Sequence, residues 1–314
     1  MEWNMLEEQQ DFLRLLEKQG KSFNTVKNYK ADLSCFNSFL INKQKNLKLR
    51  AFTPTQVQEY SQFLSQKYDS SNSVRRRVQA LRLFFDYLLT RNIFEENPLK
   101  KMAVSPKVLD APAPTLFPEV LALNRLLHNR VKSTEGLGQL VHFRNLVIFH
   151  LIYGAGLKVS DLAKLHLAAI LKDHKGLRVL VEHPKRDPYS IPLPVSFKPL
   201  FQDYKNSYSQ YQESQGLDLD EILFNANPYK ILSGGLSPRG IELFFEEIRR
   251  ETKSEITAKS LRQSCIFKWL NMNIPHATIK EWLGVAPSYS LELYLDEYKK
   301  DPTSLVFQDL PEAE

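Results

Sequence analysis

Four short stretches in the second half of the chain contain the side chains best suited to chemistry. The stretches are LIYGAGLKVSDLAKL, EHPKRDPYS, TAKSLRQS and LGVAPSYSLELY. Their candidate side chains are Lys158, Lys185, Arg186, Lys259, Arg262 and Tyr294. Ammonium and guanidinium groups bind anions, and a guanidinium can hold two oxygens at once. A phenol among such cations is a hydrogen-bond donor and a candidate nucleophile.

Each of these residues also has an ordinary structural interpretation. Tyr294 could be a tyrosine of an amphipathic helix, like Tyr289 nearby. Arg262 could pair with a carboxylate at the edge of the core, and Lys158 and Lys259 could be solvated lysines. The residue types alone leave both interpretations open, so the elements that position these side chains have to be considered.

Motif composition excludes the most common enzyme classes. The sequence has no HExxH, GxxxxGKS/T, GxGxxG or GxSxG pattern, so neither a metal nor a nucleotide cofactor is expected. The net charge is +6. The first 100 residues contain 16 Lys and Arg against 11 Asp and Glu, an excess compatible with a polyanionic partner.

The apolar pattern and the two cysteines are typical of a cytoplasmic protein. No apolar run of about 18 residues occurs, so no membrane span is expected. Cys35 and Cys265 lie far apart in apolar helical contexts. We interpret them as reduced core residues of a cytoplasmic protein.

Helical periodicity predicts four helices in the first 100 residues. The first two are amphipathic, with apolar residues at three- and four-residue spacing. Ser22 is a candidate N-cap of the second helix, and Thr53 followed by Pro54 is typical of the start of the third. The fourth is SVRRRVQALRLFFDYLLTRN. Together these helices predict an N-terminal domain over residues 1–100.

A proline-rich segment separates this domain from a second, mainly helical one. NPLKKMAVSPKVLDAPAPTLFP contains five prolines and predicts an extended linker, set at 101–117, so that the second domain covers 118–314. In that domain LRVLVEH and PYSIPLP are β-rich runs that predict a hairpin. Helices are predicted at about 118–130, 143–153, 195–214, 237–252, 257–272, 275–283 and 288–300.

Taken in order, these stretches resemble a tyrosine recombinase of the Xer and phage-integrase family. SFNTVKNYKADLSCFNSFL and the fourth helix resemble the family's four-helix, SAM-like core-binding domain, and the four stretches above resemble the boxes of its catalytic domain. The resemblance covers nearly the whole chain. It implies a mainly α, two-domain clamp around duplex DNA, with a small β-hairpin or sheet in the second domain.

The resemblance also implies a chemistry. In this family a tyrosine attacks a DNA phosphodiester and forms a 3′-phosphotyrosyl link without a metal ion. Two arginines hold the phosphate oxygens, a lysine of the hairpin protonates the leaving 5′-oxygen, and two histidines, or a histidine and a tryptophan, add hydrogen bonds.

Carried onto this sequence, the resemblance implies that Tyr294 is the nucleophile and Arg262 the second arginine. Tyr294 lies nine residues after Val285, which is the family's spacing between its last histidine or tryptophan and the nucleophile. Lys185, or its neighbour Arg186, takes the position of the hairpin lysine.

Three positions depart from the family's pattern. Lys158 stands at the first arginine, Lys259 at a histidine, and Val285 at the last histidine or tryptophan. Lys158 keeps a charge but loses the planar fork, Lys259 is a poor proton shuttle near neutral pH, and Val285 has no donor. This degenerate set predicts a DNA-binding recombinase relative with impaired or no strand cleavage. The alternative is an active recombinase in which the two lysines substitute adequately.

The resemblance also suggests how the chain meets its partners. The DNA-backbone contacts that it implies are Arg75, Arg76, Arg77, Lys27 and Lys30 in the first domain and Arg186 in the second. The C-terminal triplet Leu305, Val306 and Phe307 suits the family's use of this segment to dock onto a neighbouring protomer. A homo-oligomer, or an assembly with a paralogue on DNA, is therefore expected. A protein-interaction scaffold that does not bind DNA is the remaining alternative.

Overall fold

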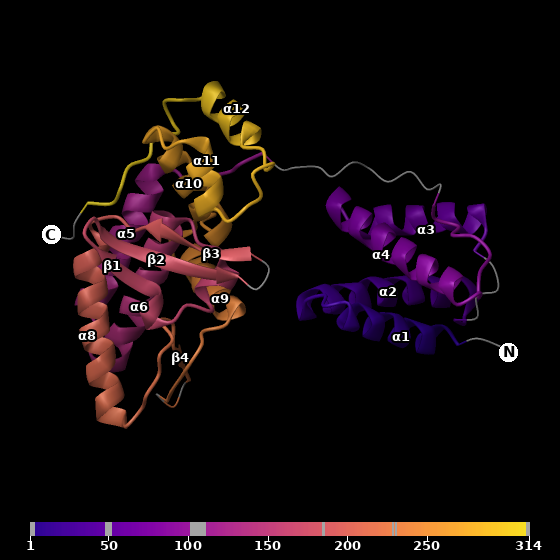
Figure 1. Cartoon of the computed structure of the whole chain (residues 1–314), viewed down its shortest axis with the longest axis horizontal. Helices are drawn as coiled ribbons and strands as arrows, with labels where there is room; N and C mark the ends of the chain where they lie inside the picture. The colour runs from indigo at the N-terminus through magenta and orange to yellow at the C-terminus, as the bar shows by residue number, and fades with distance from the viewer. Residues whose placement is uncertain are drawn as a thin grey trace. The chain divides into compact units, whose positions relative to one another are not determined.

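The chain divides into two compact units in the computed structural model, which describes residues 4–47, 52–100, 111–183, 186–227, 229 and 231–311. The units are Met1–Asp110 and Ala111–Glu314 (Figure 1). The first ten residues of the predicted linker, 101–110, lie outside the described residues. No helix in the described part of the chain is long and apolar enough to cross a membrane.

The first unit is built from amphipathic helices, as predicted. They are α1 (Met5–Lys18), α2 (Phe23–Gln44), α3 (Pro54–Lys67) and α4 (Ser71–Thr90). Ser22 caps α2, and Thr53 caps α3 in a capping box with Gln56, with Pro54 in the first turn. The apolar faces meet in a core rich in aromatic rings, among them Phe36 and Phe85.

The second unit is mainly helical around one central helix. Its helices are α5 (Phe117–Lys132), α6 (Gly136–Ala155), α7 (Val159–Leu162), the 3₁₀ turn η1 (Leu167–Ala169), α8 (Phe197–Gln215), α9 (Pro238–Thr252), α10 (Ala258–Asn271), α11 (His276–Trp282) and α12 (Glu292–Lys300). α6 is buried continuously from Arg144 to Ala155, which explains its strongly apolar sequence. α5, α8 and α10 pack around it.

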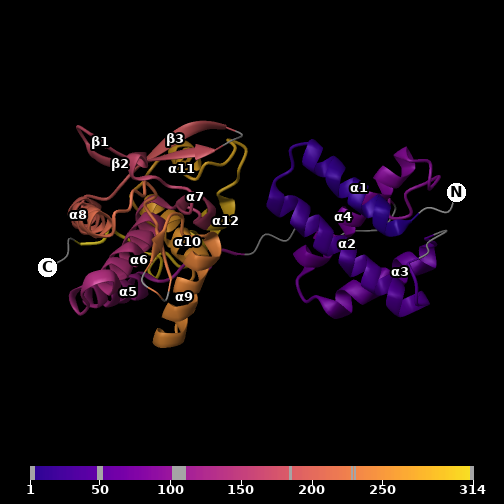
Figure 2. The same ribbon diagram turned by 90° about the horizontal axis from the view of Figure 1, so that it is seen from below.

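A small antiparallel sheet covers one face of these helices (Figure 2). β2 (Gly176–His183) and β3 (Arg186–Pro192) form the predicted hairpin, and β1 (Ile170–Asp173) adds a third strand beside β2. The sequence did not reveal β1, because only Ile170 in this strand is partly buried and the strand shows no alternation. A second, shorter ladder joins β4 (Asn225–Ala226) and β5 (Leu232–Ser233).

The end of the proline-rich segment is fixed to the second unit before α5 begins. The Ser264 hydroxyl donates a hydrogen bond to the Thr115 carbonyl (2.6 Å), and the hydroxyls of Thr115 and Ser260 are 2.7 Å apart. The Ala113 amide donates to the Gln263 side chain (3.2 Å). Residues 111–116 therefore belong structurally to the second unit through their bonds to α10.

The C-terminal tail also packs onto the second unit of the same chain. Leu305, Phe307 and Leu310 are buried, and the Phe307 ring lies 6.0 Å from that of Phe267 on α10. The Lys268 ammonium, almost wholly buried, contacts the Asp309 carboxylate at 2.6 Å. Of the triplet expected to dock onto a neighbour, Leu305 and Phe307 are thus buried within one chain here, and Val306 is exposed.

A buried histidine makes the stability of the second unit depend on pH. His150 on α6 is fully buried with its Nε2 3.3 Å from Asn124 Oδ1, and burial lowers its pKa from 6.5 to about 3. The unfolded chain therefore binds this proton below about pH 6.5, whereas the folded unit binds it only near pH 3. Stability from this group is complete above pH 6.5 and falls by up to about 1.4 kcal/mol per pH unit as the pH is lowered.

Urea unfolding at about pH 7 and pH 5 should show this effect as a loss of stability at the lower pH. In His150→Asn the loss of unfolding free energy between the two pH values should be smaller, because this side chain no longer takes up a proton on unfolding. His276→Asn, which changes an exposed histidine, serves as the control. Equal pH dependence of the parent and His150→Asn would contradict the assignment.

Candidate functional site

Arg262 lies in the second turn of α10, and its guanidinium is held by backbone carbonyls. Thr257 caps the helix in a capping box with Ser260, which fixes where the helix begins. Arg262 Nε donates to the Gly156 carbonyl (2.6 Å) and Nη2 to the Leu283 carbonyl (3.3 Å). Because carbonyl acceptors orient the fork without neutralising it, the positive charge remains available to an anion. This geometry disfavours the interpretation of Arg262 as half of an ion pair.

Tyr294 on α12 lies beside this guanidinium. Its ring is half-buried and packs against Phe267 of α10 at 5.5 Å. Burial raises the pKa of the phenol, Tyr289 raises it further, and the charge of Arg262 opposes the rise. The Tyr294 phenol thus lies within electrostatic reach of Arg262, and its proton has to be removed for it to act as a nucleophile.

Lys158 brings a second positive charge to the same place. It is the N-cap residue of α7 and follows Gly156, whose left-handed φ of 61° ends α6. A Cβ at Gly156 would lie 2.8 Å from the Trp269 ring, so only glycine fits this turn. Burial lowers the pKa of Lys158, and the nearby charges of Arg262 and Arg186 lower it further.

Arg186 is the third cation of this cluster. It begins β3 and reaches across to Gly284, just after α11, where an added Cβ would collide with its guanidinium. Its Nη2 donates to the Tyr189 hydroxyl (3.1 Å), and Cζ lies 4.6 Å from the centre of that ring. Lys185, the other candidate for the hairpin lysine, lies outside the described residues.

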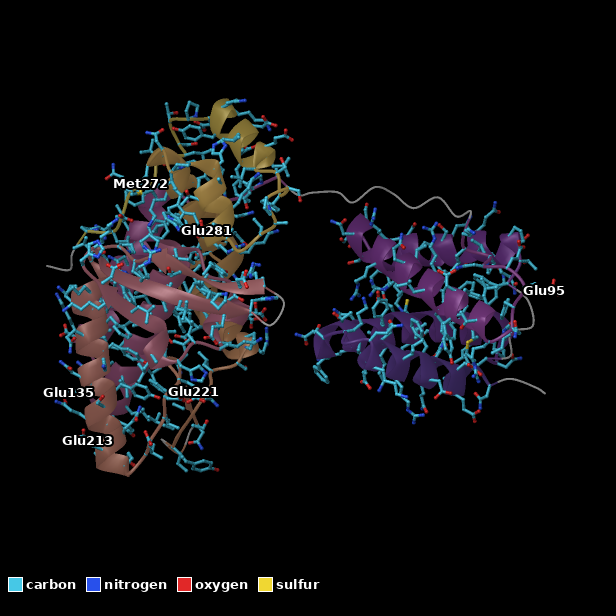
Figure 3. All side chains as sticks on the ribbon, in the orientation of Figure 1. Glu95, Glu135, Glu213, Glu221, Met272 and Glu281 are labelled. Atoms are coloured by element: carbon cyan, nitrogen blue, oxygen red, sulfur yellow. The ribbon has the colours of Figure 1, made fainter. Side chains whose placement is uncertain are left out.

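The surroundings of α11 leave this cluster positive. Glu281, labelled in Figure 3 on α11, accepts a hydrogen bond from the Gly284 amide through its carbonyl (2.8 Å), while its side chain is exposed. Asp161 on α7 is the carboxylate whose field reaches Lys158 and Arg262, and it raises the pKa of both. The negative charge of Asp161 therefore offsets only part of the positive charge of the three cations.

The two other substituted positions lie less centrally. Lys259 is exposed on α10 and lines a small cavity of about 310 Å³ together with Glu242 and Glu246. Val285 is partly buried against the core, and its amide donates to the Lys280 carbonyl (3.1 Å). Neither side chain is among the electrostatic neighbours of Lys158.

The basic residues of the first unit differ in how far they are free to meet a partner. Arg77 is stacked on Tyr68, with its Cζ 3.5 Å from the ring centre, and donates to the Ser73 carbonyl. Arg76 Nη2 contacts the buried Asp32 carboxylate at 2.9 Å. Burial raises the pKa of Asp32, and both arginines oppose the rise.

The two predicted lysine contacts of this unit are accessible. Lys27 and Lys30 are exposed on α2, one helical turn apart, whereas Arg75 on α4 is partly buried. Sequence reasoning missed Asp32, Tyr68 and Tyr189. A buried Asp or a stacked Tyr has no spacing signal, because its partner is set by tertiary packing.

Metal-binding clusters were also sought among the described residues. No group of three or more His, Cys, Asp or Glu side chains there is arranged to hold a metal ion.

Known proteins share similarity in sequence with this chain. A family model described as the phage integrase N-terminal SAM-like domain matches residues 10–92. Tyrosine recombinase XerC of Listeria monocytogenes serotype 4b is 27% identical over 314 residues, covering 98% of both chains. XerC of Staphylococcus carnosus is 26% identical over 283 residues, covering 88% of both.

Solved structures agree on the fold. Lambda integrase bound to DNA matches with a TM-score of 0.64 at 13% identity, covering 96% of this chain and 99% of that one. The XerH recombinase bound to its difH substrate matches with a TM-score of 0.64 at 14% identity, covering 89% and 79%. The chain therefore has a SAM-like domain followed by an integrase-like catalytic fold with cations and a tyrosine gathered at one place. Its sequence is similar over nearly its whole length to the XerC tyrosine recombinases.

Proposed function

We propose that this tyrosine recombinase relative binds duplex DNA and acts in DNA recombination, with weak or no strand cleavage of its own. One observation mainly supports the proposal: the Arg262 guanidinium is held by carbonyls beside Tyr294, with Lys158 nearby. Fixed positive charge with neutral acceptors is suited to an anion. A DNA phosphate is the favoured anion, because the relatives are recombinases and lambda integrase and XerH were solved with DNA.

Weak cleavage follows from what the substituted side chains lack. An ammonium at Lys158 makes a point contact where a guanidinium would hold two phosphate oxygens. Val285 offers no side-chain donor. Each lost contact to the transition state costs about 10²–10³ in rate, although such losses are not additive.

The active-recombinase alternative also has a specific observation in its favour. Burial and the neighbouring arginines lower the pKa of Lys158, which makes it a better proton donor and acceptor near neutral pH than an ordinary lysine. Tyr294 retains its place beside Arg262. The two readings differ in whether a covalent adduct forms, and that difference can be measured.

For the first unit, we propose that Lys27 and Lys30 make the principal DNA-backbone contacts. Both lysines are exposed on one helix, so they can meet a phosphate without first breaking a buried contact. Arg76 and Arg77 are partly committed to Asp32 and Tyr68, and their part in binding is therefore smaller.

Oligomerisation on DNA belongs to the same proposal. Lambda integrase has been solved as a dimer bound to a core site and as a tetramer bound to a Holliday junction, each with a TM-score of 0.63 to this chain. We propose that this chain likewise assembles on DNA, with a copy of itself or with a paralogue.

Retention of a duplex of about 30 base pairs should fall steeply with salt. If six to ten phosphates are contacted, affinity drops by about 10³–10⁵ between roughly 50 and 200 mM salt, because bound cations release counterions. The double variant Lys27→Ala, Lys30→Ala should reduce the slope of log affinity against log salt by about two. Arg14→Ala, which removes an exposed arginine paired with Asp11, is the control.

The measurement is fluorescence anisotropy at four or five salt concentrations. Failure of the parent to retain DNA even at the lowest salt would refute DNA binding and favour the scaffold alternative. Equal slopes for the double variant and Arg14→Ala would remove the two lysines from the proposed interface.

A further inference from the structure

The guanidinium of Arg186 is positioned by contacts that come from two distant parts of the chain. The ring of Tyr189, three residues further along β3, packs against this guanidinium, and the Tyr189 hydroxyl accepts a hydrogen bond from Nη2. Gly284 leaves room for it because an added Cβ there would collide with both terminal nitrogens. The strand pairing shifts between Val181 and His183, the partner of Arg186, so an irregularity or bulge lies in β2 just before this pair. Bulges of this kind redirect the side chains that follow them.

This guanidinium has donors that the described residues do not use. Nε is buried and has no hydrogen-bond partner there, and the phenol of Tyr189 accepts from Nη2 alone. A buried donor without a partner destabilises the folded state. The cost is removed if an anion brings an oxygen to the fork. The Lys158 ammonium lies within electrostatic reach of Arg186, so it adds a second positive charge for such an anion.

We infer that Arg186 is the second guanidinium of the phosphate site and that Tyr189 is its positioning residue. The inference rests on the proposed function, and it assigns the phosphate a fork that Lys158 cannot supply. The Arg186 fork stands over Gly284, the residue before Val285, so it provides a donor next to the position where the valine has none. In this arrangement one phosphate is bound by three cations, Arg186, Arg262 and Lys158. Tyr189 holds the Arg186 guanidinium in the orientation that this contact needs.

The test uses the full chain with inorganic phosphate as the probe, at constant ionic strength against chloride. Phosphate should raise the Tm of the second unit by about 5 °C or more at saturation, because it binds the folded state only. Arg186→Ala should weaken phosphate at least about tenfold, and Arg186→Lys should not restore it, since the fork is lost. Tyr189→Phe keeps the ring and should have a smaller effect than Tyr189→Ala.

A pair of glycine variants provides a matched control for the contact between Arg186 and Gly284. Gly284→Ala and Gly216→Ala place alanine at similar left-handed φ angles, +58° and +62°. The added methyl at position 284 meets Arg186, whereas nothing lies within 4 Å of the one at position 216. Both variants should lose similar stability, but only Gly284→Ala should weaken phosphate. Because the strain is common to both, a difference in phosphate affinity reports the displaced arginine.

The same variants are then measured for retention of the 30-base-pair duplex. Parallel losses for Arg186→Ala and Gly284→Ala on both probes support the inference. It is overturned if Arg186→Ala binds phosphate like the parent, if the two glycine variants behave alike, or if phosphate does not stabilise the parent. An effect on inorganic phosphate without one on the duplex would assign the site to a free anion and contradict the inference. If the parent protein does not bind the duplex at all, the proposed function is refuted instead.

Discussion

Combining Lys158→Arg, Lys259→His and Val285→His in one chain should raise the rate at which Tyr294 forms a covalent DNA adduct by about three to four orders of magnitude. The first change turns a point contact into a bidentate one, and the other two supply imidazole donors. Each restored transition-state contact is worth about 10²–10³, and the combined gain is smaller than the product because such contacts act together.

The substrate is a nicked duplex carrying the sequence that the protein selects from a randomised pool. The nick lets the short strand beyond the cleavage point diffuse away, so that the covalent intermediate accumulates and can be counted on a denaturing gel. Tyr294→Phe should abolish the adduct in the triple variant. Tyr298→Phe, on the same helix and also partly exposed, should leave it unchanged.

Two outcomes would contradict the proposal. Rapid adduct formation by the parent, lost in Tyr294→Phe, would establish the active-recombinase alternative. No adduct from a triple variant that still binds DNA would mean that these three positions do not complete the site around Arg262.

Of the three changes, Lys158→Arg has the strongest structural support. Lys158 already lies within the electrostatic reach of Arg262 and Arg186, so a longer planar side chain there can meet the same anion. Lys259 is exposed beside Glu242, and a histidine there has to turn inward to contribute. We therefore expect the single Lys158→Arg variant to account for the largest part of the gain.

The helices could be predicted from sequence because their signals are local. Ser22, Thr53 and Pro54 mark helix starts through contacts within one turn, and the structure has α2 and α3 beginning there. The long apolar run predicted a helix at 143–153, but α6 begins at Gly136, about two turns earlier, where two glycines interrupt the apolar residues. β1 was missed for a similar reason, because its register is set by β2 and not by its own pattern.

The site could be predicted in part, and the rest depends on contacts between distant residues. Arg262 and Tyr294 were predicted from the order and spacing of short stretches, and in the structure the two side chains lie within electrostatic reach of each other. The contact of Arg186 with Gly284 joins residues 98 positions apart, so no local pattern could show it. Likewise, the sequence predicted three equivalent cations at Arg75 to Arg77, but two of them, Arg76 and Arg77, lie within 3.9 Å of the buried Asp32 carboxylate on α2.

Phe307→Ala should lower the free energy of unfolding of the second unit by about 3–5 kcal/mol. Phe307 is 1% exposed and packs against Phe267 and Phe117, and its amide donates to the Asn271 side chain (2.6 Å). Truncation leaves a cavity and removes a large buried apolar surface. Urea unfolding followed by circular dichroism measures the change.

The neighbouring residue supplies the control. Val306 is 47% exposed in the same apolar triplet, and Val306→Ala should change stability by no more than about 0.5 kcal/mol. Equal, small effects of the two variants would mean that the tail is not held against its own unit in solution. A large effect confined to Phe307→Ala has a consequence for assembly. A tail that leaves to dock on a neighbouring protomer has to give up the Phe267 contact and the Lys268–Asp309 pair, so exchange requires a partner surface that restores both.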